Sequence, residues 1–151
     1  MTTSKTQAKQ ARAAARLSAV QALYQFDMEG TQLPILLDEF HRHRLGMEID
    51  DAQFAKADVA FFDDVVKGVV ARRDEIDELL SSKLSEGWSL GRLDKTMLQI
   101  LRAGTYELMA RPDVPTGAAI TEYLDVCHAF FDSREAKFLN GVLDSVAKSV
   151  R

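Results

Sequence analysis

The sequence has few of the residues that interrupt helices. Its 151 residues include only three prolines and eight glycines, while alanine and leucine are abundant. Proline lacks a backbone donor and glycine loses the most conformational freedom on folding, so both are unfavourable inside helices. No strand-like alternation of apolar and polar residues competes with the helical spacing. The composition therefore predicts an all-α protein.

Cysteines and long apolar runs are also scarce. Cys127 is the sole cysteine, which excludes an internal disulfide and fits a reducing cytosol. The sequence has no run of about 18 apolar residues that could cross a membrane, and its start lacks the apolar core of a secretory signal. The Arg/Ala-rich start resembles a transit peptide, but it continues directly into a helical pattern. We therefore expect a cytoplasmic protein with no membrane partner.

Acidic residues are absent before Asp27, although the net charge of the chain is −4. The charged side chains of the first 26 residues are Lys5, Lys9, Arg12 and Arg16, here called the basic stripe. Their spacing of i, i+4, i+7 and i+11 places them along one edge of a helix, expected from about Gln7 to Glu29 and ended by Gly30. An apolar stripe is expected beside it. Its members are Ala13, Leu17, Val20, Tyr24 and Met28.

The basic stripe has two interpretations with about equal support from the pattern alone. A run of charges is usually a solvated face. Cations near a helix N-terminus, however, oppose the helix dipole, at about 0.3–1 kcal/mol each. Contacts with the phosphates of a nucleic acid would outweigh this cost, since each contact releases counterions.

Helical periodicity predicts five further helices. They lie at about 34–45, within 58–84 as one long helix, and at about 93–111, 118–131 and 135–148. The glycine-containing stretch "SEGWSLGRLD", residues 85–94, interrupts the pattern. We expect one domain over residues 1–151, with an N-terminal helical half at about 7–84 and a C-terminal half at about 92–150.

Three other features invite a functional interpretation, and a structural one is favoured for each. "HRHR" at residues 41–44 suggests a metal or phosphate cluster, but His41 and His43 diverge on a helix. Cys127 beside His128 suggests a nucleophile and base, but a core thiol is favoured. Trp88 could stack on a base, but a plug between the two helical halves is favoured. No nucleotide loop or zinc pattern occurs either, so we expect no enzyme, cofactor or metal.

"KFLNG" at residues 137–141 is unusual for a helix, because glycine costs about 1 kcal/mol there relative to alanine. Gly141 could permit close approach of another helix. Lys137, Phe138 and Asn140 offer a cation, a stacking face and an amide, a combination typical of single-stranded RNA recognition. Packing and RNA contact remain equal alternatives for Phe138 and Asn140.

The chain resembles the NusB family of bacterial transcription antitermination factors. The resemblance lies in "ARLSAVQALYQFD", in "LDKTMLQILRAGTYELMARPDVPTGAAITEYLDVCHAF" and in "KFLNGVLD". It implies about seven helices in two packed subdomains and a non-catalytic role. It also implies binding of boxA, a single-stranded RNA of ribosomal RNA leaders, together with the ribosomal protein that acts as NusE, in an antitermination complex on RNA polymerase.

The resemblance also implies site residues. The arginine-rich motif of the family falls on Arg12 and Arg16, with Lys9 as an addition, and Tyr24 closes the "AVQALY" motif. Lys137, Phe138 and Asn140 match the C-terminal motif. The chain departs from the family where Ala13 to Ala15 interrupt the arginines and where "FFDSREA" replaces a glycine-containing turn.

Two alternative functions remain open at this point. The same helical domain occurs fused to ribosomal RNA methyltransferases, so the chain could be an RNA-binding appendage of such a system. It could also be a helical adaptor that binds only protein.

Overall fold

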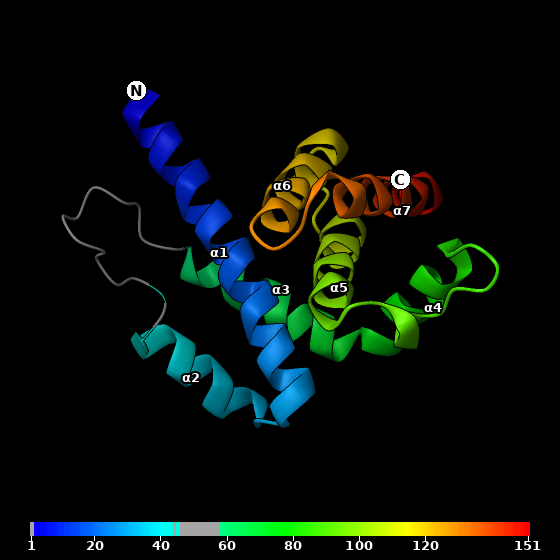
Figure 1. The fold of residues 1–151 in the computed structure, drawn as a ribbon. Coiled ribbons are helices and arrows are strands. Elements are labelled where there is room, and N and C mark those ends of the chain that lie inside the picture. Colours follow the sequence, from blue (N-terminus) through cyan, green and yellow to red (C-terminus); the bar gives the residue numbers. More distant parts are fainter. Residues whose placement is uncertain (1, 44, 46–57) are drawn as a thin grey trace. The chain divides into compact units, whose positions relative to one another are not determined.

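The computed structural model describes residues 2–43, 45 and 58–151. These residues form seven α-helices and one 3₁₀-helix and contain no strand, which confirms the predicted all-α class. The chain divides into two compact units, Met1–Lys67 and Gly68–Arg151. The helices are α1 (Thr2–Glu29), α2 (Leu33–His43), α3 (Val59–Ala71), α4 (Arg73–Lys83), η1 (Leu90–Arg92), α5 (Lys95–Ala110), α6 (Thr116–His128) and α7 (Ser133–Val150), shown in Figure 1.

In the first unit, α1 packs against α2. Helix α1 begins earlier than predicted but ends as predicted, at Gly30, whose φ of 70° suits glycine and whose N–H donates to Phe26 O. The predicted apolar stripe is wrong for Ala13, Tyr24 and Met28, which are exposed. The buried residues of α1 are instead Ala15, Arg16, Ala19, Val20, Ala22 and Leu23.

This buried face explains where the basic stripe lies. Arg12, Arg16, Ala19 and Leu23 are spaced by four, three and four residues and share one side of the helix. The basic stripe therefore continues the buried face toward the N-terminus and does not flank it. The pattern misled because alanine is small and its burial carries little hydrophobic signal.

The single long helix predicted within 58–84 is wrong, because it is broken at Arg72 (φ −110°, ψ 21°). The Arg72 N–H still donates to Gly68 O, and the Ile76 N–H donates to Arg72 O. The Arg72 side chain donates to both carboxylate oxygens of Glu75, at 2.9 and 3.2 Å, and this bond lowers the pKa of Glu75. Asp74 and Glu75 also stabilise the new N-terminus through the helix dipole.

The division between the units differs from the expected one. We expected a boundary in the stretch 85–94, but the units meet between Lys67 and Gly68, within α3. The reason is that α4 packs on α5 and α7 and so belongs to the second unit. The stretch 85–94 is a connection inside that unit and contains η1.

In the second unit, α5 packs against α4, α6 and α7 (Figure 1). Asp94 caps α5 by accepting from the Thr96 and Met97 N–H groups, and every residue from Met97 to Leu108 is buried. The polar residues inside this helix are paired in part: Arg102 donates to both oxygens of Asp77 at 2.8 Å, and the Tyr123 hydroxyl donates to Glu107 at 2.8 Å.

Helix α7 is fixed at both ends. It begins with a capping box, in which Asp132 and Glu135 bond reciprocally to backbone N–H groups. Beyond its end, the Arg151 side chain donates to the carbonyls of Leu108, Arg111 and Val114 at the end of α5 and just beyond it. These bonds lie at the two ends of the helix that contains the "KFLNG" segment.

Candidate nucleic-acid interface

Burial increases along the basic stripe. Lys5 and Lys9 are exposed. The Arg12 side chain is 36% exposed, whereas Arg16 is only 4% exposed. Lys5, Lys9 and Arg12 can therefore reach a ligand in solution. The predicted direct contact through Arg16 does not fit its burial.

Both arginines lie against one aromatic ring, that of Phe61 in α3. The guanidinium carbon of Arg12 is 4.6 Å from the ring centre, and that of Arg16 is 4.9 Å from it. These distances are within the range of cation–π attraction. The ring itself is 2% exposed, so its attraction for the cations is little screened by water.

Asp58, just before α3, connects the same elements. One carboxylate oxygen accepts the Phe61 N–H at 2.9 Å, which caps α3. The other oxygen lies 3.6 Å from Nε of Arg12. The backbone N–H of Asp58 donates to Ala11 O at 3.0 Å. The start of α3 is thus fastened to α1 at the turn that carries Arg12.

Tyr24 lies further along α1 and is 39% exposed. Its ring is available to a ligand, in agreement with a surface role but not with the apolar stripe to which the pattern assigned it. Met28, one turn later, is also exposed. These two side chains form an exposed apolar edge at the C-terminal end of α1.

In the second unit, Lys137 and Asn140 are exposed and Phe138 is half-buried. Gly141 does not serve close approach of another helix, which was one of the open alternatives, because no atom of the described residues lies within 4 Å of a Cβ added there. Close approach occurs instead at Gly104, where an added Cβ would lie 3.1 Å from Leu143. The "KFLNG" segment therefore presents a cation, an amide and an open backbone to solvent.

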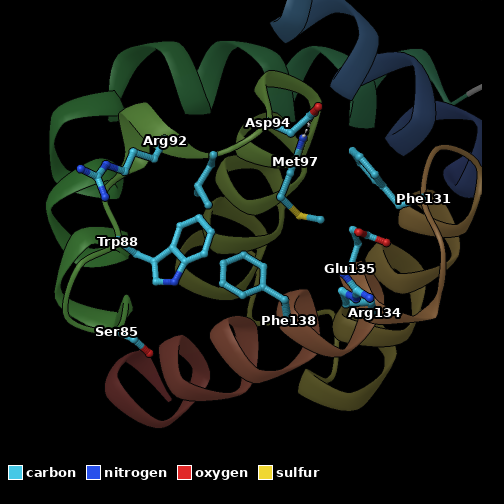
Figure 2. A pocket seen from close by; sticks show the side chains of 10 residues that line it. Ser85, Trp88, Arg92, Asp94, Met97, Phe131, Arg134, Glu135 and Phe138 are labelled. Carbon is cyan, nitrogen blue, oxygen red and sulfur yellow. Dashed lines mark hydrogen bonds between the residues drawn. The ribbon is translucent and has the colours of Figure 1, made fainter.

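The Phe138 ring lines a pocket of about 440 Å³ (Figure 2). Its centre lies 6.5 Å from that of Trp88, with the planes tilted by 42°. Trp88 is 56% exposed, so the predicted plug between helical halves is wrong. The remaining apolar lining is Leu93, Met97 and Phe131.

Three of the polar residues that line this pocket serve the local structure. Asp94 caps α5, and Glu135 belongs to the capping box of α7. Arg92 donates to Gly87 O at 2.9 Å, and Gly87 has a φ of 90°. These bonds hold the rim in place, so the pocket offers preformed apolar and aromatic surface.

The other candidate features are structural, as favoured. His41 bonds Asp63 at 2.6 Å while His43 is exposed, so the two rings diverge, and Arg44 lies outside the described residues. Cys127 is fully buried, and burial raises the pKa of its thiol. Among residues 2–43, 45 and 58–151, no group of three or more His, Cys, Asp or Glu side chains could hold a metal ion.

Sequence reasoning missed Phe61 and Asp58. Nothing in the pattern of α3 distinguishes Phe61 from Phe62, because both occupy buried helical positions. Asp58 showed only the signal of a helix N-cap, an acid just before an apolar run. Their link to the basic stripe depends on the packing of α3 on α1, which the spacing of residues does not give.

Comparison with known proteins shows the family of the chain. The model of the NusB family matches residues 13–148. The chain belongs to the NusB family. It is 75% identical to the transcription antitermination protein NusB of Novosphingobium aromaticivorans over 93% of this chain and 95% of that protein. It is 49% identical to the transcription antitermination protein NusB of Rhizobium rhizogenes over 93% of this chain and 88% of that protein.

Solved structures of the family have the same fold. T. maritima NusB matches with a TM-score of 0.73 at 30% identity, covering 91% of this chain and 90% of that one. A structure of the antitermination factors NusB and NusE in complex with dsRNA matches with a TM-score of 0.73 at 26% identity, covering 91% of this chain and 96% of the matched chain. In the described part of the present chain, no helix is both long and apolar enough to cross a membrane.

Proposed function

We propose that this protein is a non-catalytic transcription antitermination factor that binds single-stranded boxA RNA of ribosomal RNA leaders together with NusE. The observation that carries the proposal is the basic stripe, whose Lys5, Lys9 and Arg12 are accessible and which has no acid within the first 26 residues. The solved complex of a similar NusB with NusE and dsRNA supports the binding of RNA and of NusE. The bound pair then joins the antitermination complex on RNA polymerase.

The residues have distinct roles in this proposal. Lys9 and Arg12 contact phosphates, and Arg16 acts indirectly from its buried position. Tyr24 offers a ring on the same helix. Lys137 offers a second phosphate contact in α7, and its neighbours Phe138 and Asn140 offer a stacking face and a base-reading amide.

RNA titrations test the proposal. The double variant Lys9→Ala/Arg12→Ala should bind a boxA-like single strand more weakly. The slope of log affinity against log salt concentration should fall by about 0.7 for each lost phosphate contact. A duplex of the same sequence and a scrambled single strand show whether single-stranded boxA is preferred.

The matched control is Arg42→Ala/Lys67→Ala, which removes the same charge from exposed positions of α2 and α3. The affinity of this variant for RNA should stay within about twofold of the wild-type value, because only weak long-range electrostatic attraction is lost. If the wild-type chain binds no RNA, or if both double variants lose affinity equally, the basic stripe is a solvated face. Binding of NusE without RNA would then favour the protein-only adaptor.

A further inference from the structure

The geometry around Phe61 points to a role beyond core packing. We propose that Phe61 is a positioning residue for RNA binding, whose ring holds the Arg12 guanidinium ready to contact a phosphate. The inference rests on the proposed function and deepens it, because it names a buried residue on which the phosphate contact depends.

The first step concerns the orientation of Arg12. An exposed arginine samples many rotamers and loses this freedom when it binds an anion. Here the guanidinium is held from two directions, by the Phe61 ring at 4.6 Å and by the Asp58 carboxylate at 3.6 Å from Nε. The side chain is nevertheless 36% exposed. Part of the ordering cost of phosphate binding is thus met in the free protein.

The second step concerns the ring itself. Phe61 is itself fixed, because it is 2% exposed and its N–H bonds the Asp58 carboxylate at 2.9 Å. Arg16, almost fully buried, lies over the same ring at 4.9 Å. Two guanidinium groups near one ring repel each other, and the negative ring face and the Asp58 carboxylate offset this repulsion. An aliphatic side chain would fill the space but would not attract the cations.

The neighbouring Phe62 provides a matched control. It is also buried in α3, but its ring stacks on Phe40 at 5.6 Å and lies against His41 at 6.0 Å. Phe61→Leu and Phe62→Leu remove the same group from adjacent buried positions. A purely structural effect would follow the stability of each variant, whereas the proposed effect is confined to Phe61.

The test is a double-mutant cycle between Phe61→Leu and Arg12→Ala, with boxA-like single-stranded RNA as the probe. Affinities are measured at a temperature at which thermal melts show each variant to be folded. Phe61→Leu should weaken binding about three- to tenfold, and Phe62→Leu by less than about twofold. In the Arg12→Ala background, Phe61→Leu should cause no further loss. If Phe61→Leu does not fold, Phe61→Met takes its place.

The outcomes separate the inference from the proposed function. Wild-type affinity in Phe61→Leu, an equal loss in Phe62→Leu, or a full loss in the Arg12→Ala background would overturn the role of Phe61 alone, provided that Arg12→Ala still weakens binding. Failure of the wild-type chain to bind RNA would overturn the proposed function and this inference together. If the wild-type chain binds RNA but Arg12→Ala does not weaken binding, this inference alone is overturned.

Discussion

At the scale of the residue, Phe138 offers the sharpest test of the surface on α7. Its ring is half-buried, lines the pocket and lies 6.5 Å from the exposed Trp88 ring. Two aromatic faces at the rim of a preformed apolar pocket suit the stacking of an unpaired base. Stacking of a base on an aromatic side chain contributes about 1–3 kcal/mol by alanine substitution.

Phe138→Leu should therefore weaken RNA binding about 5- to 100-fold while the melting temperature changes little. The substitution keeps most of the apolar bulk and removes the π-face. Phe130→Leu is the control, because Phe130 is an exposed aromatic in the connection that follows α6 and does not belong to the pocket lining. If Phe138→Leu lowers the melting temperature and loses RNA affinity only as it unfolds, Phe138 packs in the folded protein and does not stack on a base.

Single residues also show where sequence reasoning works and where it stops. Cys127 was predicted to be a core thiol and is fully buried, because its helical neighbours place it on an apolar face. Arg16 was predicted to be a surface cation and is buried. Helical spacing gives the side of α1 on which Arg16 lies. The aromatic ring against which it lies comes from α3, which is distant in the sequence.

At the scale of the element, two glycines inside helices should respond oppositely to alanine. Gly141 in α7 has open space around an added Cβ, so Gly141→Ala should raise the free energy of unfolding by about 1 kcal/mol through helix propensity. At Gly68 in α3, an added Cβ would lie 2.1 Å from Cζ of the buried Tyr106 ring. Gly68→Ala should therefore lower the free energy of unfolding by about 1–3 kcal/mol despite the better propensity.

Urea denaturation of both variants and the wild type measures these changes. The m-value should stay constant, so that a shifted midpoint reports stability alone. The two substitutions are chemically identical, and each serves as the control for the other. A stabilised Gly68→Ala variant would contradict the close contact between α3 and Tyr106.

Most helices were predictable because apolar residues recur with helical spacing and because caps are local signals. Gly30 marks a helix end in the sequence itself, as predicted, whereas the Asp132–Glu135 capping box was not recognised and starts α7 at Ser133, before the predicted start at about 135. The break at Arg72 was not predictable, because the apolar positions on either side of it, such as Val69 and Ile76, keep one helical spacing. Packing of α4 on α5 and α7, which the sequence pattern does not show, assigns α4 to the second unit.

At the scale of the whole molecule, the uneven charge distribution gives the proposed function its physical basis. The chain is acidic, with a net charge of −4, so it does not bind RNA by general attraction. The basic stripe has only three accessible cations, Lys5, Lys9 and Arg12, and the cation of the C-terminal motif in α7 is Lys137. So few phosphate contacts predict modest affinity for RNA and a shallow dependence on salt.

A protein partner that extends the RNA surface should correct this weakness. NusE should tighten the binding of a boxA-like single strand by about tenfold or more, which corresponds to about 1.4 kcal/mol. Because coupling between two ligands is reciprocal, the RNA should tighten the binding of NusE by the same factor. Titrations of RNA with and without saturating NusE, and of NusE with and without RNA, measure the two coupling factors.

The variant Lys9→Ala/Arg12→Ala should weaken RNA binding both with and without NusE, because NusE adds contacts and does not replace those of the basic stripe. Equal RNA affinities with and without NusE would show that the two partners bind independently, and this chain would then load RNA without cooperation.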